Sequence, residues 1–499
     1  MTSEPPSFGK RCRITGSGFR FDTQYTQLPS VFYSFGDPSP VSQPKLTVVN
    51  LPLSQELGLR LQDLSPETQA ALFSGRTLAE GSLPFSQAYA GHQFGGFSIL
   101  GDGRAHVLGE HIAPDGRRVD IQLKGSGPTP YSREGDGRAT LGPMLREYII
   151  SEAMAALRVP TTRSLAVVRT GDPVLREGLL SGAVLVRVAA SHLRVGTFEF
   201  AAALHRPHLQ ALLQYAIQRH DPALATTPCP ALALWDGVAQ RQAALIAAWM
   251  RVGFVHGVMN TDNMTLSGET IDYGPCAFVD RYAGATVFSS IDEEGRYAFG
   301  NQPAVAQWNL ARLAEALLPL IDTQRDKAVA RAQERLTRFR DWMNAAWTDM
   351  MREKLGLPGK QDEDISIATA LLRLMEETSS DYTDTFRALS GATALPPTLA
   401  SAPEWDMWRS RWDARCGRAQ GDAPSFDARG RMRAANPAVI PRNHLVEEAL
   451  DAAVRSEDMG PLHRLLAALE SPYEERPELA DFQRLPPASF SSYQTFCGT

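Results

Sequence analysis

One short segment of this 499-residue chain carries the residue types of a nucleotide–metal site. Residues 256–263 have the sequence His-Gly-Val-Met-Asn-Thr-Asp-Asn, and residues 272–274 (Asp-Tyr-Gly) follow after a short gap. In protein kinases, the asparagine of H-R-D-x-x-x-x-N and the aspartate of a downstream D-F-G hold magnesium beside the triphosphate. Asn263 and Asp272 fill these two positions, so we predict that they are metal ligands.

The catalytic aspartate of the kinase pattern is missing from this segment. The position two residues after His256 is Val258, which can neither accept a proton nor orient a hydroxyl group. The nearest carboxylate is Asp262, next to Asn263. This displacement indicates either an inactive kinase or a nucleotide enzyme whose reacting phosphorus lies elsewhere along the triphosphate. We interpret His256 as a structural hydrogen-bonding residue and not as a catalytic one.

Composition and charge favour a globular enzyme of two or three packed units. The chain is too long for one hydrophobic core, and its 43% apolar and 21% charged content is ordinary. A formal net charge of −6 gives no global attraction to nucleic acid or anionic lipid, so we expect neither partner. Without a bilayer-length apolar run or a signal-peptide pattern, the sequence predicts a cytoplasmic location. The five widely spaced cysteines argue against zinc and a disulfide scaffold.

Hydrophobic periodicity divides the chain into a strand-rich part and a helical part. We predict an irregular extension with a strand or two over residues 1–80, and a strand-rich region over residues 81–204. Residues 205–400 are predicted to form a helical region, and residues 401–499 a helical C-terminal region with a cysteine-containing tail. The predicted strands are 105–110, 118–124 and 183–188, and the predicted helices are 144–157, 239–252, 304–321, 325–350, 363–377 and 444–469.

A lysine and a glutamate in the strand-rich region have the kinase spacing. Lys124 ends a predicted strand, and Glu147 lies in the first turns of the only helix predicted there. An ion pair of this kind holds the ammonium group rigid, so that it meets phosphate oxygens. Taken alone, such a pair is usually a surface salt bridge, and its significance depends on the loops that flank it.

Two glycine-rich loops bracket Lys124 in the sequence. Gly-Asp-Gly-Arg-Ala occurs at residues 101–105 and again at residues 135–139. Glycines let backbone N–H groups approach phosphate closely, and the arginines add positive charge, so we predict a phosphate clamp. A ligand-free hairpin is the alternative for the first loop, and an Asp136 that only caps a turn is the alternative for the second.

Two arginines follow the predicted helix. Arg187 lies inside the apolar strand sequence Val-Arg-Val, and Arg194 lies seven residues later. A buried arginine needs an acidic or phosphate partner to offset its desolvation, and a structural salt bridge would meet that need. Beside Lys124, however, extra guanidinium groups suit a site for a triphosphate or for a pyrophosphate leaving group.

Six motifs spread over nearly the whole chain form a set that is similar to a known family. They are Gly101–Ala105, Gln122–Gly127, Leu145–Tyr148, His256–Asn263, Asp272–Pro275 and Asn436–Pro437. The set resembles the selenoprotein O family of kinase-like protein adenylyltransferases. The resemblance implies an α+β, bilobal kinase-like (pseudokinase) fold, with a β-rich N-lobe, a helical C-lobe and a helical C-terminal extension.

The resemblance also implies a reaction and its site. The family's activity is transfer of AMP from ATP to Ser, Thr or Tyr hydroxyls of proteins, with ATP bound head-to-tail relative to kinases, and bacterial members also transfer UMP with manganese. The implied metal is therefore Mg²⁺ or Mn²⁺, with Asn263 and Asp272 as ligands, and Asp262 matches the proposed general base. The implied nucleotide-binding residues are Gly101, Gly103, Arg104, Lys124, Asp136, Gly137, Arg187, Arg194 and Asp272.

The tail cysteine and the competing functions complete the expectations. Cys497 occupies the region where animal relatives carry selenocysteine. One hypothesis is a reversible disulfide between Cys497 and Cys276, and the alternative is that Cys276 is only a core thiol.

Two other functions stay open, namely a kinase-type phosphotransferase that uses Asp262 as its base and a nucleotide-binding scaffold without turnover. No feature of the sequence identifies the protein substrate or the oligomeric state.

Overall fold

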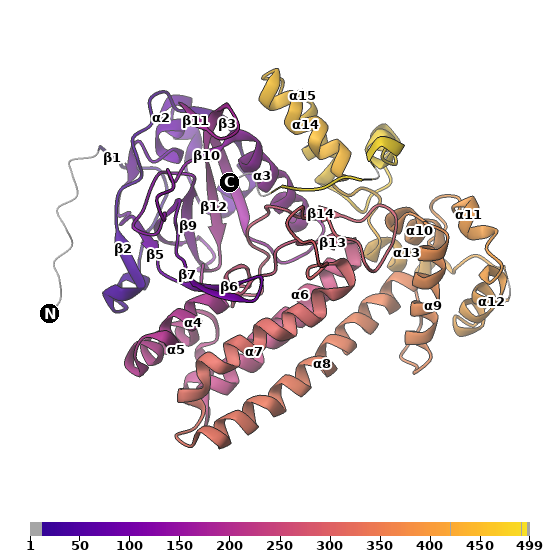
Figure 1. The fold of residues 1–499 in the computed structure, drawn as a ribbon. Helices are drawn as coiled ribbons and strands as arrows, with labels where there is room; N and C mark the ends of the chain where they lie inside the picture. The colour runs from indigo at the N-terminus through magenta and orange to yellow at the C-terminus, as the bar shows by residue number, and fades with distance from the viewer. Residues whose placement is uncertain (1–11, 420, 491, 497–499) are drawn as a thin grey trace.

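The computed structural model describes residues 12–419, 421–490 and 492–496 and shows a strand-rich N-terminal region followed by a helical region (Figure 1). The strands are β1 Arg13–Ile14, β2 Tyr33–Phe35, β3 Lys45–Val49, β4 Leu78–Ala79, β5 Phe85–Gln87, β6 Ala90–Gln93, β7 Gly96–Ile99, β8 Ala105–Ile112, β9 Arg118–Lys124, β10 Ala139–Thr140, β11 Arg163–Leu175, β12 Leu179–Ala189, β13 Phe254–Val255 and β14 Ala277–Phe278. The helices are α1 Leu51–Glu56, α2 Pro66–Phe73, α3 Leu141–Ala156, α4 Val195–Ala203, α5 Arg206–His220, α6 Pro230–Val252, α7 Gln302–Ile321, α8 Arg325–Leu355, α9 Asp364–Glu377, α10 Tyr382–Leu389, α11 Pro397–Ala400, α12 Trp405–Arg415, α13 Phe426–Ala435, α14 Asn443–Arg455 and α15 Gly460–Leu469.

An eight-stranded antiparallel sheet organises the N-terminal region. Its order is β2-β5-β8-β9-β12-β11-β3, with β10 paired to β12. The predicted hairpin of β8 and β9 is confirmed, and the strand at the N-terminal extension, β3, pairs with β11 at the edge of this sheet. Both faces of the central strands are buried: Leu185 of β12 contacts the core beneath α3, whereas Val184 and Val186 face the core beneath α1 and α2. This double cover holds the ends of β9 and β12 in fixed positions.

The helical region is built on three long helices that lie side by side in Figure 1. α6 packs against both α7 and α8, and the buried indole of Trp235 on α6 donates from Nε1 to the carbonyl of Leu310 on α7 at 2.9 Å. β13 and β14 follow α6 and enclose residues 256–276, which include the predicted metal-binding motifs. No helix within the described ranges has the length and apolar character that crossing a membrane requires.

The predicted single helix over residues 444–469 is wrong. The chain forms α14 and α15 instead, and Glu457 between them adopts a left-handed backbone with φ of +54°. Pro461 lies in the first turn of α15, where its missing N–H costs nothing, whereas inside a continuous helix it would remove a hydrogen bond. The other predicted helices are present with shifted ends, and α6 begins at Pro230, nine residues before the predicted start.

A buried arginine connects three segments of the helical region and provides a test of the fold. Arg442 lies 2.7 Å from Asp280, 2.8 Å from Asp381 and 3.0 Å from Asp384, and its side chain is 2% exposed. Arg442→Leu leaves these carboxylates without their cation, so we expect the free energy of unfolding to fall by about 3–5 kcal/mol. Thermal and urea unfolding would measure the loss.

The matched control is Arg455→Leu on the surface of α14. This arginine contacts Asp451 at 3.4 Å, but its side chain is 77% exposed, so we expect a change below about 1 kcal/mol. Equal losses for the two variants would show that the Arg442 cluster does not stabilise the fold.

Candidate active site

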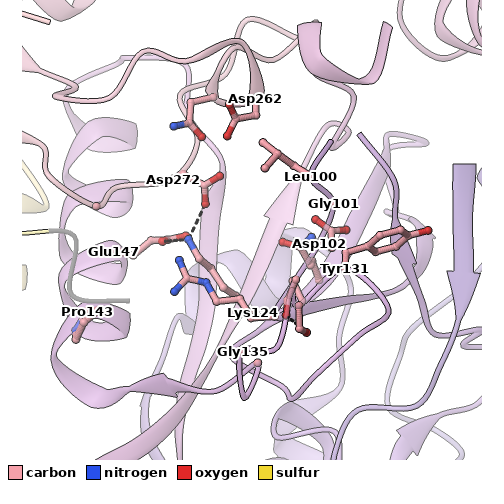
Figure 2. Close-up of a pocket in the computed structure, with 18 of the residues that line it drawn as sticks. Leu100, Gly101, Asp102, Lys124, Tyr131, Gly135, Pro143, Glu147, Asp262 and Asp272 are labelled. Carbon is pink, nitrogen blue, oxygen red and sulfur yellow. Dashed lines mark hydrogen bonds and ion pairs between the residues drawn. The ribbon is translucent and has the colours of Figure 1, made fainter. Parts of the chain in front are cut away.

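A cavity of about 490 Å³ lies between the strand-rich region and the loop that follows β13 (Figure 2). Its lining includes every described residue that the sequence proposed for nucleotide, metal or catalysis. These residues are Gly101, Gly103, Arg104, Lys124, Asp136, Gly137, Glu147, Arg187, Arg194, Asp262, Asn263 and Asp272. The volume is in the range of small-molecule binding sites.

Five charged residues meet at the inner end of the cavity, and we call them the ion cluster: Lys124, Glu147, Arg187, Arg194 and Asp272. Lys124 Nζ lies 2.7 Å from Glu147 Oε2 and 2.6 Å from Asp272 Oδ1. Arg187 bridges the same two carboxylates, with Nε 3.0 Å from Glu147 Oε1 and Nη2 2.6 Å from Asp272 Oδ1. Arg194 Nη1 is 3.7 Å from Asp272 Oδ2.

Separate elements bring the ion cluster together. Lys124 ends β9 and Arg187 lies on the neighbouring β12, where the register pairs Leu185 with Lys124 and Arg187 with Gln122. Glu147 projects from α3, which packs across the same sheet. Asp272 has a left-handed backbone with φ of +62°, a conformation that an L-residue keeps only where its surroundings hold it.

The ion cluster is electrostatically biased toward an anion. Burial would raise the pKa of the Asp272 carboxyl, but Arg187, Lys124 and Arg194 hold it well below its usual range. Burial also raises the pKa of Glu147, but the nearby Arg187 and Lys124 outweigh this effect, so the pKa of Glu147 is lowered. Three cations therefore face two ionised carboxylates, and the cluster carries a surplus of positive charge that would suit an anionic ligand such as a phosphate group.

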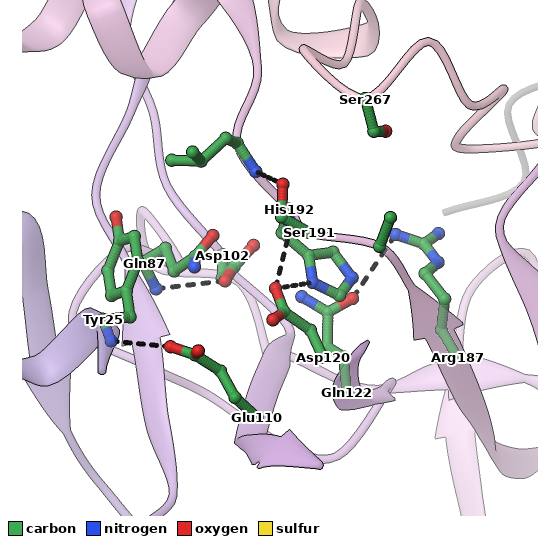
Figure 3. A network of polar contacts seen from close by, with 12 residues as sticks. Tyr25, Gln87, Asp102, Glu110, Asp120, Gln122, Arg187, Ser191, His192 and Ser267 are labelled. Carbon is green, nitrogen blue, oxygen red and sulfur yellow. Dashed lines mark hydrogen bonds and ion pairs between the residues drawn. The ribbon is translucent and has the colours of Figure 1, made fainter. Parts of the chain in front are cut away.

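A polar network around Asp120 and His192 (Figure 3) holds the segment that leads to Arg194. Asp120 accepts hydrogen bonds from the backbone N–H of His192 at 2.9 Å and from Arg219 Nη2 at 2.7 Å. The carbonyl of His192 then accepts from Arg194 Nε at 3.2 Å, and the Arg194 guanidinium lies 4.3 Å from the centre of the Tyr89 ring. The buried Asp120 thus fixes the segment from which Arg194 enters the cavity.

The loop of residues 256–263 presents three polar side chains to the cavity, those of Asn260, Asp262 and Asn263. His256 Nε2 donates to the carbonyl of Ile271 at 2.9 Å, which joins this loop to the residue before Asp272. Asp262 is buried, and Oδ1 has no hydrogen-bond partner in the described part of the chain. A Cβ at Gly91 would lie 2.3 Å from Asp262 Oδ1, so only glycine leaves room for this carboxylate.

The two glycine-rich loops line the same cavity but differ in what their residues do. Gly101 has φ of +149°, and a Cβ there would approach Tyr131 Cγ to 2.5 Å, so this loop packs directly on the aromatic ring. Asp136 accepts from the backbone N–H of Arg138 at 2.9 Å and from Arg176 Nη1 at 2.8 Å. Asp136 therefore caps a turn and positions arginines in this structure.

Sequence reasoning missed several residues that shape the cavity. Tyr131 supports the first loop, and Asp102 accepts from the backbone N–H of Gln87 at 3.0 Å, which anchors that loop to β5. Asn260 lines the cavity and links to residues outside it. The Asp within Gly-Asp-Gly was a visible signal for Asp102, whereas an isolated tyrosine or asparagine gave none.

The donor atoms of the loop fit a magnesium-type ion shared with a nucleotide. Asn263 donates from Nδ2 to the carbonyl of Val258 at 2.9 Å. This bond uses the amide nitrogen and leaves Oδ1 as the atom that could bind a metal ion. Asp272 Oδ2 is a further oxygen donor. The described residues contain no group of three His, Cys, Asp or Glu placed to hold a metal, and magnesium commonly takes one or two protein ligands together with phosphates and water.

The structure describes only one of the two cysteines of the hypothetical disulfide. Cys276 is buried, and burial raises the pKa of its thiol to about 11, which disfavours the reactive thiolate. Thr495 in the tail donates from Oγ1 to the carbonyl of Pro275 at 2.8 Å. Cys497 lies outside the described residues, so its disulfide with Cys276 stays a prediction.

The burial of Asp262 generates a stability prediction. Desolvation raises the pKa of this carboxyl from 3.8 to about 6, with Arg194 opposing the shift. The neutral form is favoured in the folded protein, so this contribution to stability is present below about pH 4 and is lost as pH rises through about 6. In metal-free buffer, we expect the free energy of unfolding of Asp262→Asn, relative to that of the wild type, to increase by about 1 kcal/mol as the pH rises from 5 to 8.

Urea unfolding at several pH values would measure this gain, with the exposed Asp406→Asn as the control. The control variant and the wild type should keep a constant difference over the same pH range. If the difference in free energy of unfolding between Asp262→Asn and the wild type also stayed constant with pH, the raised pKa of Asp262 would be contradicted.

Comparison with known proteins agrees with the geometry of this site. A family model described as "Protein adenylyltransferase SelO" matches residues 17–470. A protein of Geobacillus kaustophilus named "Protein nucleotidyltransferase YdiU" is 55% identical over 97% of this chain and 100% of its own length. A protein of the same name from Syntrophotalea carbinolica is 53% identical over 97% of this chain and 98% of its own length. The chain therefore belongs to the SelO family of protein adenylyltransferases.

Proposed function

We propose that this protein transfers AMP from ATP to Ser, Thr or Tyr hydroxyls of proteins and releases pyrophosphate. The names of its relatives support nucleotide transfer to proteins. The single observation that carries the proposal is the ion cluster, where three buried cations converge on Asp272 at the inner end of the cavity. Such a concentration of positive charge suits the β- and γ-phosphates of a leaving pyrophosphate.

The proposal includes a kinase-like arrangement of two lobes around the nucleotide. The strand-rich region would be the N-lobe, with Lys124 of β9 paired to Glu147 of α3, and the helical region would be the C-lobe. Arg187 and Arg194 add inner charges beyond that lysine. These charges support a nucleotide bound with its γ-phosphate inward and its α-phosphorus toward Asp262, the reverse of the kinase orientation.

The reaction would be an in-line displacement at the α-phosphorus. The acceptor oxygen bonds to this phosphorus while the bond from the phosphorus to the bridging oxygen of pyrophosphate breaks. The proton of the acceptor hydroxyl passes to Asp262, whose pKa of about 6 brings its basicity close to neutral pH. Lys124, Arg187 and Arg194 would stabilise the charge that develops on the departing pyrophosphate.

Asn263 and Asp272 would hold Mg²⁺ or Mn²⁺, and a bound ion of this kind neutralises phosphate charge and orients the leaving group. Three further arginines, Arg104, Arg138 and Arg176, also line the cavity. We propose that they contact the remainder of the nucleotide, whether ATP or UTP.

Labelled nucleotides test the reaction directly. With magnesium, an acceptor protein and ATP labelled on the α-phosphate, the wild type should transfer the label to protein, whereas label on the γ-phosphate should leave with pyrophosphate. Asp262→Asn should reduce the rate of α-label transfer about 10²–10⁴-fold, because it removes the proton acceptor but keeps the shape of the side chain. Asp272→Ala should abolish transfer.

The two competing functions give different results in the same experiment. Transfer of γ-label without α-label would identify a kinase and refute the inverted nucleotide. Binding of ATP without transfer of either label, with an acceptor present and manganese also tried, would identify a scaffold. Folding of each variant is checked by its thermal unfolding, so that loss of transfer is not confused with loss of structure.

A further inference from the structure

A second cavity, of about 790 Å³, lies beside the active site, and we call it the side groove. Phe94, Ile291 and Trp308 provide aromatic and aliphatic surface in it, and Glu293 and Glu294 lie along the same lining. Phe94 comes from the hairpin of β6 and β7, which Figure 1 shows at the border between the sheet and the long helices. Trp308 comes from α7.

The side groove and the active-site cavity are lined by neighbouring residues of the chain. Gln93 lines the active-site cavity and the next residue, Phe94, lines the side groove. Asn260, two residues before Asp262, separates them: its Oδ1 accepts from the backbone N–H of Phe94 at 3.1 Å and from the Tyr297 hydroxyl at 2.5 Å. Asn260 therefore ties the side groove to the loop that carries Asp262.

The hairpin exposes hydrophobic side chains at an energetic cost. The turn residues Phe94 and Gly95 have φ of +50° and +88°, a pair of left-handed conformations for which Asn-Gly is the favoured sequence. Phe94 is nevertheless 43% exposed, and the neighbouring Phe97 and Ile99 are 48% and 63% exposed. Strained backbone and exposed apolar surface at one place are typical of a recognition site.

The charge of the side groove indicates the chemistry of its partner. Glu293 and Glu294 are exposed, and neither forms an ion pair with another described residue. Asp292 differs, because it accepts from the backbone N–H groups of Arg296 and Tyr297 and so shapes the turn. Arg296 lies against the ring of Trp308 at 4.8 Å. The rim thus presents two unneutralised carboxylates beside an aromatic floor.

We propose that the side groove binds the acceptor protein through an extended segment that carries a hydrophobic side chain and one or more lysines or arginines close to the modified hydroxyl. The hydrophobic side chain would pack on Phe94 and Trp308, and the basic residues would pair with Glu293 and Glu294. This inference rests on the proposed function, because it names the substrate class of that reaction.

Peptide binding tests the side groove without catalysis. The probes are two fluorescent peptides with one serine and one phenylalanine each, flanked by lysines in the first and by glutamates in the second. Fluorescence anisotropy should show that the wild type prefers the lysine peptide. Glu293→Gln combined with Glu294→Gln should weaken its binding by roughly tenfold, because two rim charge pairs are lost.

The matched control removes two adjacent exposed carboxylates elsewhere, with Asp362→Asn and Glu363→Gln, and should leave peptide binding unchanged. Charge reversal with Glu293→Lys and Glu294→Lys should shift the preference to the glutamate peptide, and Phe94→Ala should weaken binding of both peptides. Equal binding of the two peptides by the wild type, or unchanged binding in the charge variants, would overturn the proposal. The proposal would also be overturned if light scattering showed that two copies of this chain associate and that the lysine peptide binds only when they dissociate.

Transfer of α-label from ATP to the two peptides separates this inference from the proposed function. If both hold, the charge variants should raise KM for the lysine peptide and leave kcat nearly unchanged. If the peptide binds as expected but receives no label, and no other acceptor is labelled, the proposed reaction fails while the side groove stands. If both peptides are labelled equally well, the reaction stands and the side groove fails.

Discussion

The arrangement of the active site depends on the charge balance at Asp272. Its carboxylate is shared by Lys124 and Arg187, which also share Glu147, and these groups come from β9, β12, α3 and the loop after β13. Buried charges are tolerated only where opposite charges satisfy them, so the sheet, the helix and the loop must all be in place before any of these residues is stable. The same contacts that join the strand-rich region to the helical region therefore build the charged end of the cavity.

The site keeps several unfavourable features that packing elsewhere must offset. Asp272 has a left-handed backbone, Asp262 has a buried oxygen without a partner, and Phe94 exposes its ring from a strained turn. Each lowers the stability of the protein without a ligand, and each lies beside one of the two cavities. The doubly covered sheet and the packing of α6 on α7 and α8 supply the compensating burial.

The sequence predicted those parts whose signals are local. Alternating apolar residues located β8 and β9, because that signal lies within each strand. Lys124, Glu147 and Asp272 were identified by motifs and their spacing along the chain, and all three line the cavity. Tertiary packing decided the rest. Nothing in the neighbourhood of Tyr131 indicates that its ring supports Gly101, and the pairing of β3 with β11 joins segments over a hundred residues apart. The helix break before Gly460 was visible in Pro461, but apolar periodicity continued across it and concealed it.

In the proposed reaction, the hairpin of β6 and β7 would link acceptor binding to chemistry, because it is fixed to the loop of residues 256–263 that carries Asp262. The backbone N–H of His92 donates to Thr261 Oγ1 at 2.7 Å, and Thr261 and His92 both bond to Glu199 of α4. Together with the bond from Phe94 to Asn260, these contacts hold the side groove at a set distance from Asp262. A flexible acceptor segment bound there loses its freedom before the reaction, which is the orientation that transfer to a hydroxyl requires. Selectivity among acceptors would then follow from the side groove, and the chemistry from the ion cluster.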